Sequence, residues 1–321
     1  MSYYNFFDKI LHKIFLGNLF LKKNFYELEK SLYLSKIANL KDHNHIFITG
    51  LPRSGTTIML NYLYDTKEFA SLTYEDMPYL MGPNLKKKFS KPNKKLLNNK
   101  ERVHNDGIFY NLQSPEAFDE VFLSLYENEN KFEEFLNYVN LILYSKQKKR
   151  YLSKNNLNYK RINIISKYFD NAKFFIMFRD PYNHSQSLLK QHNHFTKIHA
   201  ANSFSKDYMG FLKHNEFGEL HSPWNTPKDY KNNKTLDYWL EQWYFFYKDL
   251  FYRYKDTKNC YFICYESLVD SSYLDELNKI CSIVSYKKYN FFQNKNLDLK
   301  IEKKKEISNL YELMKNNFKM K

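Results

Sequence analysis

The chain has 321 residues, with 50 Lys or Arg against 35 Asp or Glu, which gives a formal net charge of +15. This length suits one large α/β domain, and only 7 Gly and 8 Pro leave no obvious linker. The basic clusters are scattered and no nucleic-acid-binding motif accompanies them, so we expect no nucleic-acid partner. We predict a single domain over residues 1–321, with a helical segment 1–43, a core 45–270 and a helical extension 271–321.

The N-terminal segment is apolar in patches that charged residues interrupt. The run 14–21 is too short to span a bilayer and lacks a small-residue cleavage site, so we expect an amphipathic helix packed on the domain. A helix lying on a membrane surface is the alternative. Cys260, Cys264 and Cys281 show no metal-ligand spacing, which argues against a disulfide framework or a zinc site and favours a reducing cytoplasm.

The first strand of the core is expected over residues 45–50, and a helix over 56–65. Between them Gly50–Thr57 has the context of a phosphate-binding loop, with two glycines five residues apart after an apolar strand. Thr56 stands where a nucleotide-triphosphatase loop carries its lysine, which argues against an ordinary Mg-ATP or GTP site. The positive charge lies instead on Arg53, which can reach an anion held by the backbone N–H groups that follow it.

Apolar spacing and capping residues predict the elements of the next hundred residues. These are a possible strand Ala70–Thr73, a loop Pro83–Asn99 over the site, a helix opened by Ser114-Pro115, a helix Lys131–Lys149, a short strand Tyr151–Lys154 and a helix Ile162–Phe169. Strands separated by helices imply an α/β fold, with a mostly parallel central sheet flanked by helices. Ligands of such a sheet bind at the carboxyl ends of its strands.

A second strand-to-helix junction lies further along the chain. Lys173–Phe178 is typical of a buried parallel strand, Asp180 suits an N-cap and Pro181 a first helical residue. Ser187 then lies about two turns into the helix, so that Arg179 and Ser187 are placed to converge on one anion.

Two late elements complete the core. A long helix over Leu236–Tyr254 carries an apolar stripe that predicts core packing. The β-prone run Cys260–Cys264 predicts a further strand, which Tyr265 follows directly.

The motif Pro52-Arg53-Ser54-Gly55-Thr56-Thr57 resembles the 5′-phosphosulfate loop of the sulfotransferases that use 3′-phosphoadenosine 5′-phosphosulfate (PAPS). Arg179 with Ser187 resembles this family's 3′-phosphate site, and Tyr265 resembles the tyrosine near the adenine. The resemblance implies a fold like that of P-loop-containing nucleoside-triphosphate hydrolases, PAPS as co-substrate and no metal. The cofactor-binding residues that it implies are Arg53, Ser54, Gly55, Thr56, Thr57, Arg179, Ser187 and Tyr265.

The same resemblance implies the residues of catalysis. Arg53 and Lys154 are expected at the transferring sulfuryl group, and Glu75, Asp76 or His104 is expected to take the acceptor proton. The sequence does not choose among these three bases. Arginine in the loop and the lack of a C-terminal Arg-Lys-Gly motif place the chain nearer the bacterial and tyrosylprotein-like branch than the cytosolic one.

The predicted function is sulfuryl transfer from PAPS to a hydroxyl or amine of an acceptor that is carbohydrate, lipid, phenol or peptide. Acceptor contacts are expected from the loops 83–105 and 192–234. Two other functions stay open at this point, a P-loop nucleotide kinase or phosphotransferase and a non-enzymatic basic protein that binds anions or membranes. The second would explain the net charge but not the ordered Arg53, Arg179 and Ser187.

Overall fold

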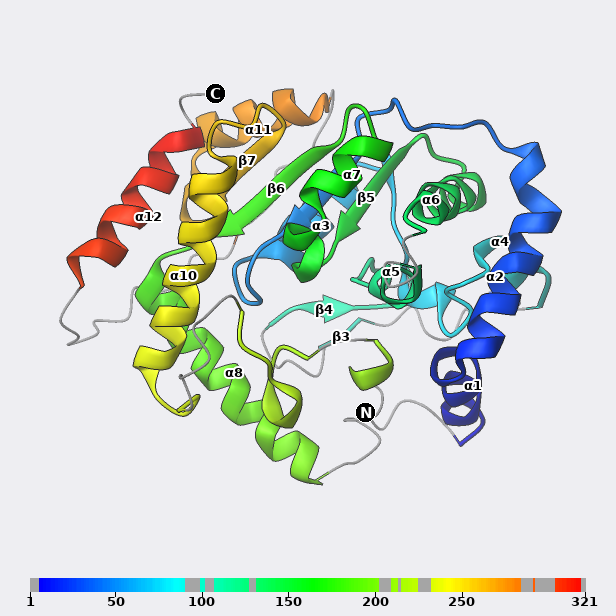
Figure 1. Ribbon diagram of the computed structural model, residues 1–321, viewed down its shortest axis with the longest axis horizontal. Coiled ribbons are helices and arrows are strands. Elements are labelled where there is room, and N and C mark those ends of the chain that lie inside the picture. The colour runs from blue at the N-terminus through cyan, green and yellow to red at the C-terminus, as the bar shows by residue number, and fades with distance from the viewer. Residues whose placement is uncertain are drawn as a thin grey trace.

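The computed structural model describes residues 6–89, 99–101, 107–126, 131–201, 209–212, 215–224, 232–283, 291 and 304–318. A five-stranded sheet lies at its centre, and every strand pair in it is parallel (Figure 1). The strands, in their order across the sheet, are β2 (Phe69–Ala70), β5 (Arg150–Lys154), β1 (Ile46–Thr49), β6 (Lys173–Phe178) and β7 (Cys260–Cys264). A short hairpin, β3 (Lys100–Glu101) with β4 (Phe109–Tyr110), forms a second sheet.

Helices precede, separate and follow the strands. They are α1 (Phe6–Gly17), α2 (Leu19–Tyr33), α3 (Thr56–Asp65), α4 (Pro83–Phe89), α5 (Glu120–Tyr126), α6 (Glu133–Lys146), α7 (Ile162–Tyr168), α8 (Pro181–Ala201), α10 (Leu236–Tyr254), α11 (Ser271–Cys281) and α12 (Lys305–Asn317). Among the described residues no helix is both long enough and apolar enough to cross a membrane.

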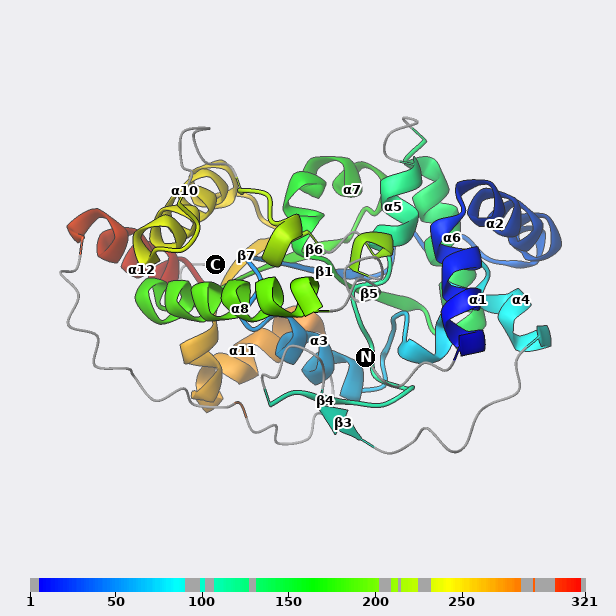
Figure 2. The ribbon, with the colours of Figure 1, turned by 90° about the horizontal axis from the view of Figure 1, so that it is seen from below.

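The two faces of the sheet bury different apolar clusters, because successive side chains of a strand point to opposite faces. Ile48 of β1 packs with Met59 of α3 and with Leu277 of α11. Its neighbour Phe47 belongs to the other cluster, with Trp243 of α10. Figure 2 shows α3 and α11 on one side of the sheet and α5 and α7 on the other. Helices on both faces explain why β1, β6 and β7 consist mostly of apolar residues.

The predicted α/β fold with a parallel central sheet is confirmed. Strands β6 and β7 and helix α10 have the expected bounds. Two expectations near the second strand are wrong. Strand β2 ends at Ala70, and Thr73 instead forms an isolated antiparallel bridge with Pro115. This pairing holds Ser114-Pro115 in extended backbone, so the following helix, α5, begins only at Glu120.

The predicted loop Pro83–Asn99 is also wrong over its first part, because residues 83–89 form α4. A buried carboxylate explains the helix. Glu29 of α2 accepts hydrogen bonds from the backbone N–H groups of Asn84 and Leu85 at 2.9 and 2.8 Å, which caps the first turn of α4. The expected loop 192–234 likewise begins later, since α8 continues to Ala201.

One buried ion pair ties α5 to the segment that precedes α7. Arg161 donates two hydrogen bonds to Glu120, at 2.7 and 3.0 Å, and their side chains are only 3% and 7% exposed. Asn155, directly after β5, donates to the same carboxylate at 2.6 Å. The pair therefore fixes the backbone at the carboxyl end of β5.

We predict that Arg161→Met lowers the free energy of unfolding by about 3–5 kcal/mol, because it leaves the Glu120 carboxylate buried without its cation. Urea denaturation measures the loss. The matched control is Arg253→Met, which breaks an exposed pair with Asp249 and should cost less than about 1 kcal/mol. Equal losses in the two variants would contradict the structural role of the buried pair.

Candidate active site

The loop after β1 has a backbone that few residues can adopt. Gly50 has φ 143°, and a Cβ atom there would lie 2.4 Å from the carbonyl oxygen of Met177 in β6. Arg53 has φ 71° and Gly55 has φ 97°, both in the left-handed region. Gly55 then serves as the N-cap of α3 without a side-chain cap. The loop thus turns sharply after β1, close to β6, and leads into the N-terminus of a ten-residue helix.

The predicted anion-binding residues gather around this loop from separate elements. Arg53 Nε donates to Ser187 Oγ of α8 at 3.2 Å. Arg179, at the end of β6, donates through Nη1 to the backbone oxygen of Arg53 at 3.2 Å. Its guanidinium carbon lies 5.6 Å from the centre of the Tyr265 ring. Tyr265 in turn covers Gly55, where an added Cβ would lie 2.4 Å from the ring.

The remaining predicted residues of the loop are Ser54, Thr56 and Thr57, all buried at the start of α3. The structure thus brings together the eight residues for which a cofactor role is expected. Two guanidinium groups lie within one small region, and the carboxylate that pairs with Arg179 is that of Glu266, at 3.9 Å. The region is accordingly suited to anions.

Two buried side chains that the sequence analysis missed hold the loop backbone. The Tyr247 hydroxyl of α10 donates to the Met177 carbonyl at 2.7 Å and accepts from the Leu51 N–H at 3.2 Å. His184 Nε2 lies 2.8 Å from the Pro52 carbonyl, which requires that this nitrogen carry the proton. The signal in the sequence was weak, since both residues lie within helices whose periodicity predicts only core packing.

Lys154 closes β5 at the same edge of the sheet, in register with Ile48 of β1. Its ammonium pairs at 3.1 Å with Glu116, which precedes α5, and both side chains are largely buried. Glu116 also lies 3.5 Å from the Tyr74 hydroxyl. Glu116 is not among the residues predicted from the sequence, because nothing in its neighbourhood indicates that it meets a lysine 38 residues later.

The two carboxylates expected as bases have other partners. Asp76 is 2% exposed; it accepts hydrogen bonds from the Thr73 N–H and hydroxyl and pairs with Lys146 at 2.8 Å. Glu75 is more exposed and pairs with Lys86 of α4 at 3.2 Å. His104 lies outside the described residues. Among the described carboxylates, Glu116 is the one paired with Lys154.

The two residues on either side of Lys154 are hydrogen-bonded to the buried carboxyl group of Asp119. Asp119 accepts hydrogen bonds from the Ser153 hydroxyl and, at 3.3 Å, from the Asn155 amide. Burial raises the pKa of Asp119 to about 6, although the Ser153 hydrogen bond opposes that rise. This network orients the backbone on which Lys154 stands.

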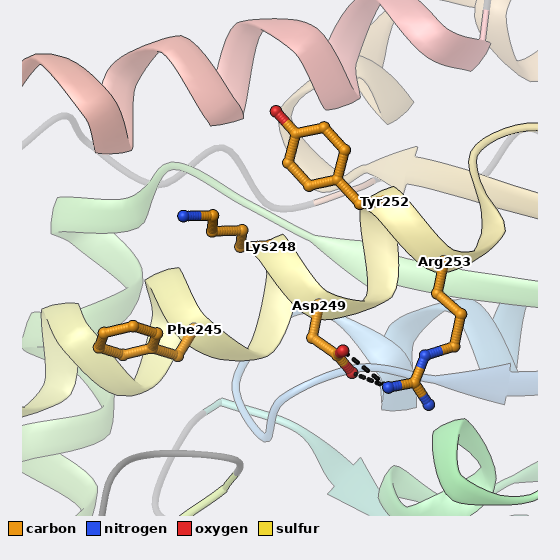
Figure 3. A pocket seen from close by; sticks show the side chains of 5 residues that line it. All are labelled: Phe245, Lys248, Asp249, Tyr252 and Arg253. Carbon is orange, nitrogen blue, oxygen red and sulfur yellow. Dashed lines mark hydrogen bonds and ion pairs between the residues drawn. The ribbon is translucent and has the colours of Figure 1, made fainter.

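A separate hollow lies along the outer face of α10 (Figure 3). Five residues of that one helix line it, and the Asp249 carboxylate there pairs with Arg253 at 2.7 Å. None of these residues belongs to the predicted site. No group of three or more His, Cys, Asp and Glu suited to a metal ion occurs in the described parts of the chain.

The chain belongs to the sulfotransferase family, whose sequence model matches residues 45–216, more than half of its length. It is a transferase enzyme, and the reaction of this class is PAPS-dependent sulfuryl transfer. The match spans the loop Gly50–Thr57, Lys154, Arg179 and Ser187. It disfavours both a nucleotide kinase and a non-enzymatic binding protein.

Three solved structures are similar to the chain. The sulfotransferase STF1 of Mycobacterium tuberculosis H37Rv is 12% identical, with 95% of this chain and 84% of that chain covered and a TM-score of 0.47. The sulfotransferase domain of the curacin biosynthetic pathway is 13% identical, with 85% of this chain and 97% of that chain covered and a TM-score of 0.41. The sulfotransferase STF9 of Mycobacterium avium is 12% identical, with 80% of this chain and 68% of that chain covered and a TM-score of 0.42. No curated protein matches the sequence.

We predict that His184 makes the free energy of unfolding fall as the pH drops from about 6.5 towards 3. Burial, helped by the nearby Arg179 charge, lowers the pKa of His184 to about 3. The unfolded chain therefore takes up this proton first, and the folded state loses up to about 1.4 kcal/mol per pH unit. Urea unfolding at pH 7 and pH 5 measures the slope, which His184→Gln should reduce.

The control variant is His194→Gln, whose ring is partly exposed on the same helix. It should keep the wild-type slope. If His184→Gln keeps that slope as well, the buried neutral imidazole is not a source of acid sensitivity.

Proposed function

We propose that Gly50–Thr57 binds the 5′-phosphosulfate of PAPS, that Arg179 and Ser187 bind its 3′-phosphate, and that Tyr265 packs against its adenine. One observation carries this assignment. Arg179 Nε is buried and makes no hydrogen bond among the described residues, since the Glu266 oxygen that pairs with it lies 3.9 Å away, beyond hydrogen-bond distance, while Nη1 is held on the loop backbone. A buried donor on a permanent cation is costly unless an anion accepts from it.

The loop itself fits the phosphosulfate end of the donor. The first N–H groups of α3 lack a capping side chain, and the guanidinium of Arg53 is hydrogen-bonded to Ser187 beside them. Oxygens of a phosphosulfate can accept from these N–H groups, and Arg53 can neutralise the charge on the bridging oxygen.

In the transfer, an acceptor oxygen or nitrogen forms a bond to sulfur while the bond from sulfur to the phosphate oxygen breaks. The leaving group is 3′,5′-bisphosphoadenosine, and the acceptor proton passes to a base. We assign to Lys154 the stabilisation of charge on the sulfuryl oxygens, and its position at the end of the strand beside the phosphate loop supports this role. A metal is not needed for these steps.

We place Glu116 first among the candidate bases, ahead of Glu75, Asp76 and His104. Its carboxylate pairs with Lys154, so a cation for the sulfuryl group and an acceptor for the proton lie side by side. Asp76 has a structural use for both oxygens, since it caps its own turn and binds Lys146. Glu75 remains the alternative, because it is the more exposed of the two sequence-predicted carboxylates.

The compartment, the branch of the family and the acceptor are further proposals. We infer a cytoplasmic enzyme of the bacterial or tyrosylprotein-like branch, a setting supported by three buried free cysteines. The acceptor remains a carbohydrate, lipid, phenol or peptide, and we infer no nucleic-acid partner. Screening acceptors with sulfate-labelled PAPS identifies the acceptor and tests the activity.

The proposed nucleotide site predicts tighter binding of a nucleotide that carries a 3′-phosphate than of one that lacks it. Calorimetry measures both affinities, with a chelator present to remove metal ions. 3′,5′-Bisphosphoadenosine should bind about 10- to 150-fold more tightly than 5′-AMP, since a charged hydrogen bond contributes about 1.5–3 kcal/mol. Arg179→Ala should remove most of this preference, and Ser187→Ala part of it. Arg253→Ala, a surface arginine of α10, serves as the control. Equal affinity of the wild type for the two nucleotides would refute the 3′-phosphate assignment.

The base is tested by turnover with an acceptor from the screen. Glu116→Gln should lower kcat by about 10²–10⁴-fold and leave the affinity for 3′,5′-bisphosphoadenosine unchanged. Glu75→Gln should keep near-normal turnover. Asp76→Asn should mainly lower stability, because it weakens a buried ion pair and a cap. If Glu75→Gln loses turnover and Glu116→Gln does not, the base that takes the acceptor proton is Glu75.

A further inference from the structure

Exposed apolar side chains are concentrated on the first two helices. Of the twelve large apolar side chains that are exposed among the described residues, six lie on α1 and α2, and Phe20 is the most exposed at 73%. Figures 1 and 2 both place these helices at one edge of the molecule. Such a concentration is unusual on a surface that only faces water.

Four of these residues form what we call the N-terminal ridge: Ile10, Ile14, Leu19 and Phe20. Ile10 and Ile14 lie one turn apart on α1, and Leu19 and Phe20 begin α2 immediately after the break at Asn18. The ridge is therefore continuous along the chain from the outer face of α1 to the start of α2.

The opposite face of α1 is packed against the protein. Leu16 is 1% exposed, and the Phe15 ring lies 4.7 Å from the Tyr79 ring and 5.5 Å from that of Phe25. The buried face thus anchors α1, and the ridge is a second apolar face that this packing does not use.

The charge next to the ridge is positive. Between Asp8 and Glu27 the sequence contains four lysines and no acidic residue, although one of the four, Lys22, is buried at 7% exposure. Lys13, which is exposed, lies between Ile10 and Ile14 on the outer side of α1. An apolar ridge with basic neighbours is complementary to a bilayer whose headgroups are anionic.

The end of α1 also contacts a segment that is expected to take part in acceptor binding. An added Cβ on Gly17 would lie 3.3 Å from the ring of Phe211, in the segment that follows α8. A few residues later Glu216 accepts a hydrogen bond at 3.2 Å from Asn156, just beyond Lys154. The end of α1 therefore contacts one part of the range 192–234, which is expected to contact the acceptor, and another part of that range contacts the residues just after β5.

We propose that the N-terminal ridge binds the surface of an anionic lipid bilayer, with Leu19 and Phe20 inserted among the acyl chains and Lys13 at the headgroups. The bound enzyme has its acceptor side near the membrane, which favours acceptors that reside there; this last clause rests on the proposed function. Membrane binding itself does not depend on the transfer reaction.

Vesicle co-sedimentation of the full chain tests the proposal. Vesicles of phosphatidylcholine mixed with equal phosphatidylserine should bind the wild type, and phosphatidylcholine alone should bind it less. Leu19→Ser with Phe20→Ser should lower the partition coefficient by at least about tenfold, because two large apolar groups no longer insert. Lys13→Glu should weaken binding to the anionic vesicles alone.

The matched control is Phe109→Ser with Leu313→Ser, which removes one phenylalanine and one leucine, 58% and 50% exposed, away from the ridge. It should bind vesicles like the wild type. Affinity for 3′,5′-bisphosphoadenosine, measured in parallel, reports on folding and on the proposed nucleotide site separately. Failure of the wild type to bind anionic vesicles, or equal losses in the two double variants, would overturn the proposal.

A second copy of the chain is the competing occupant of the ridge. Analytical ultracentrifugation distinguishes it, because a dimer that Leu19→Ser with Phe20→Ser converts to a monomer would assign the ridge to self-association and overturn lipid binding.

Discussion

The backbone of the loop between β1 and α3 is the constraint on which the site depends. A tight turn beside a buried strand leaves peptide groups that water cannot reach, and each needs a partner. Tyr247, His184 and Arg179 supply these partners to Leu51, Pro52 and Arg53 from three different elements. Because they come from α10, from α8 and from the residue that directly follows β6, the loop has its shape only when the sheet and both helices are assembled.

That arrangement also determines where charge accumulates. Parallel strands end at one edge, so Lys154, the last residue of β5, and Arg179, which directly follows β6, flank the loop that carries Arg53. The carboxylates that pair with them, Glu116 and Glu266, lie on segments outside the sheet. A sulfotransferase needs cations that are positioned before its substrate arrives, since reorganising them during the reaction would raise the barrier.

Most carboxylates near the site serve the structure, whereas one, Glu116, is paired with a lysine that is itself a candidate for catalysis. Asp76 and Glu120 are buried and bind a cation through well-formed geometry, so their charge holds the fold together. Glu29 acts similarly by capping α4. Glu116 differs, because its partner Lys154 is itself a candidate to leave the pair and contact a sulfuryl oxygen. All of these residues are carboxylates, so residue type does not distinguish a structural role from a catalytic one. The group that each carboxylate binds does distinguish them.

The sequence by itself determined the α/β class, the strands β6 and β7, the helices α3 and α10, and the turn that joins β1 to α3. These depend on apolar periodicity and on capping residues within a few positions, which local sequence contains. Only the tertiary structure decided that α4 is a helix, that Ser114-Pro115 is extended, that Tyr247 and His184 hold the loop and that Glu116 meets Lys154. Each of these results from a contact between residues distant along the chain, and the free energy of such a contact exists only once the two segments are packed together.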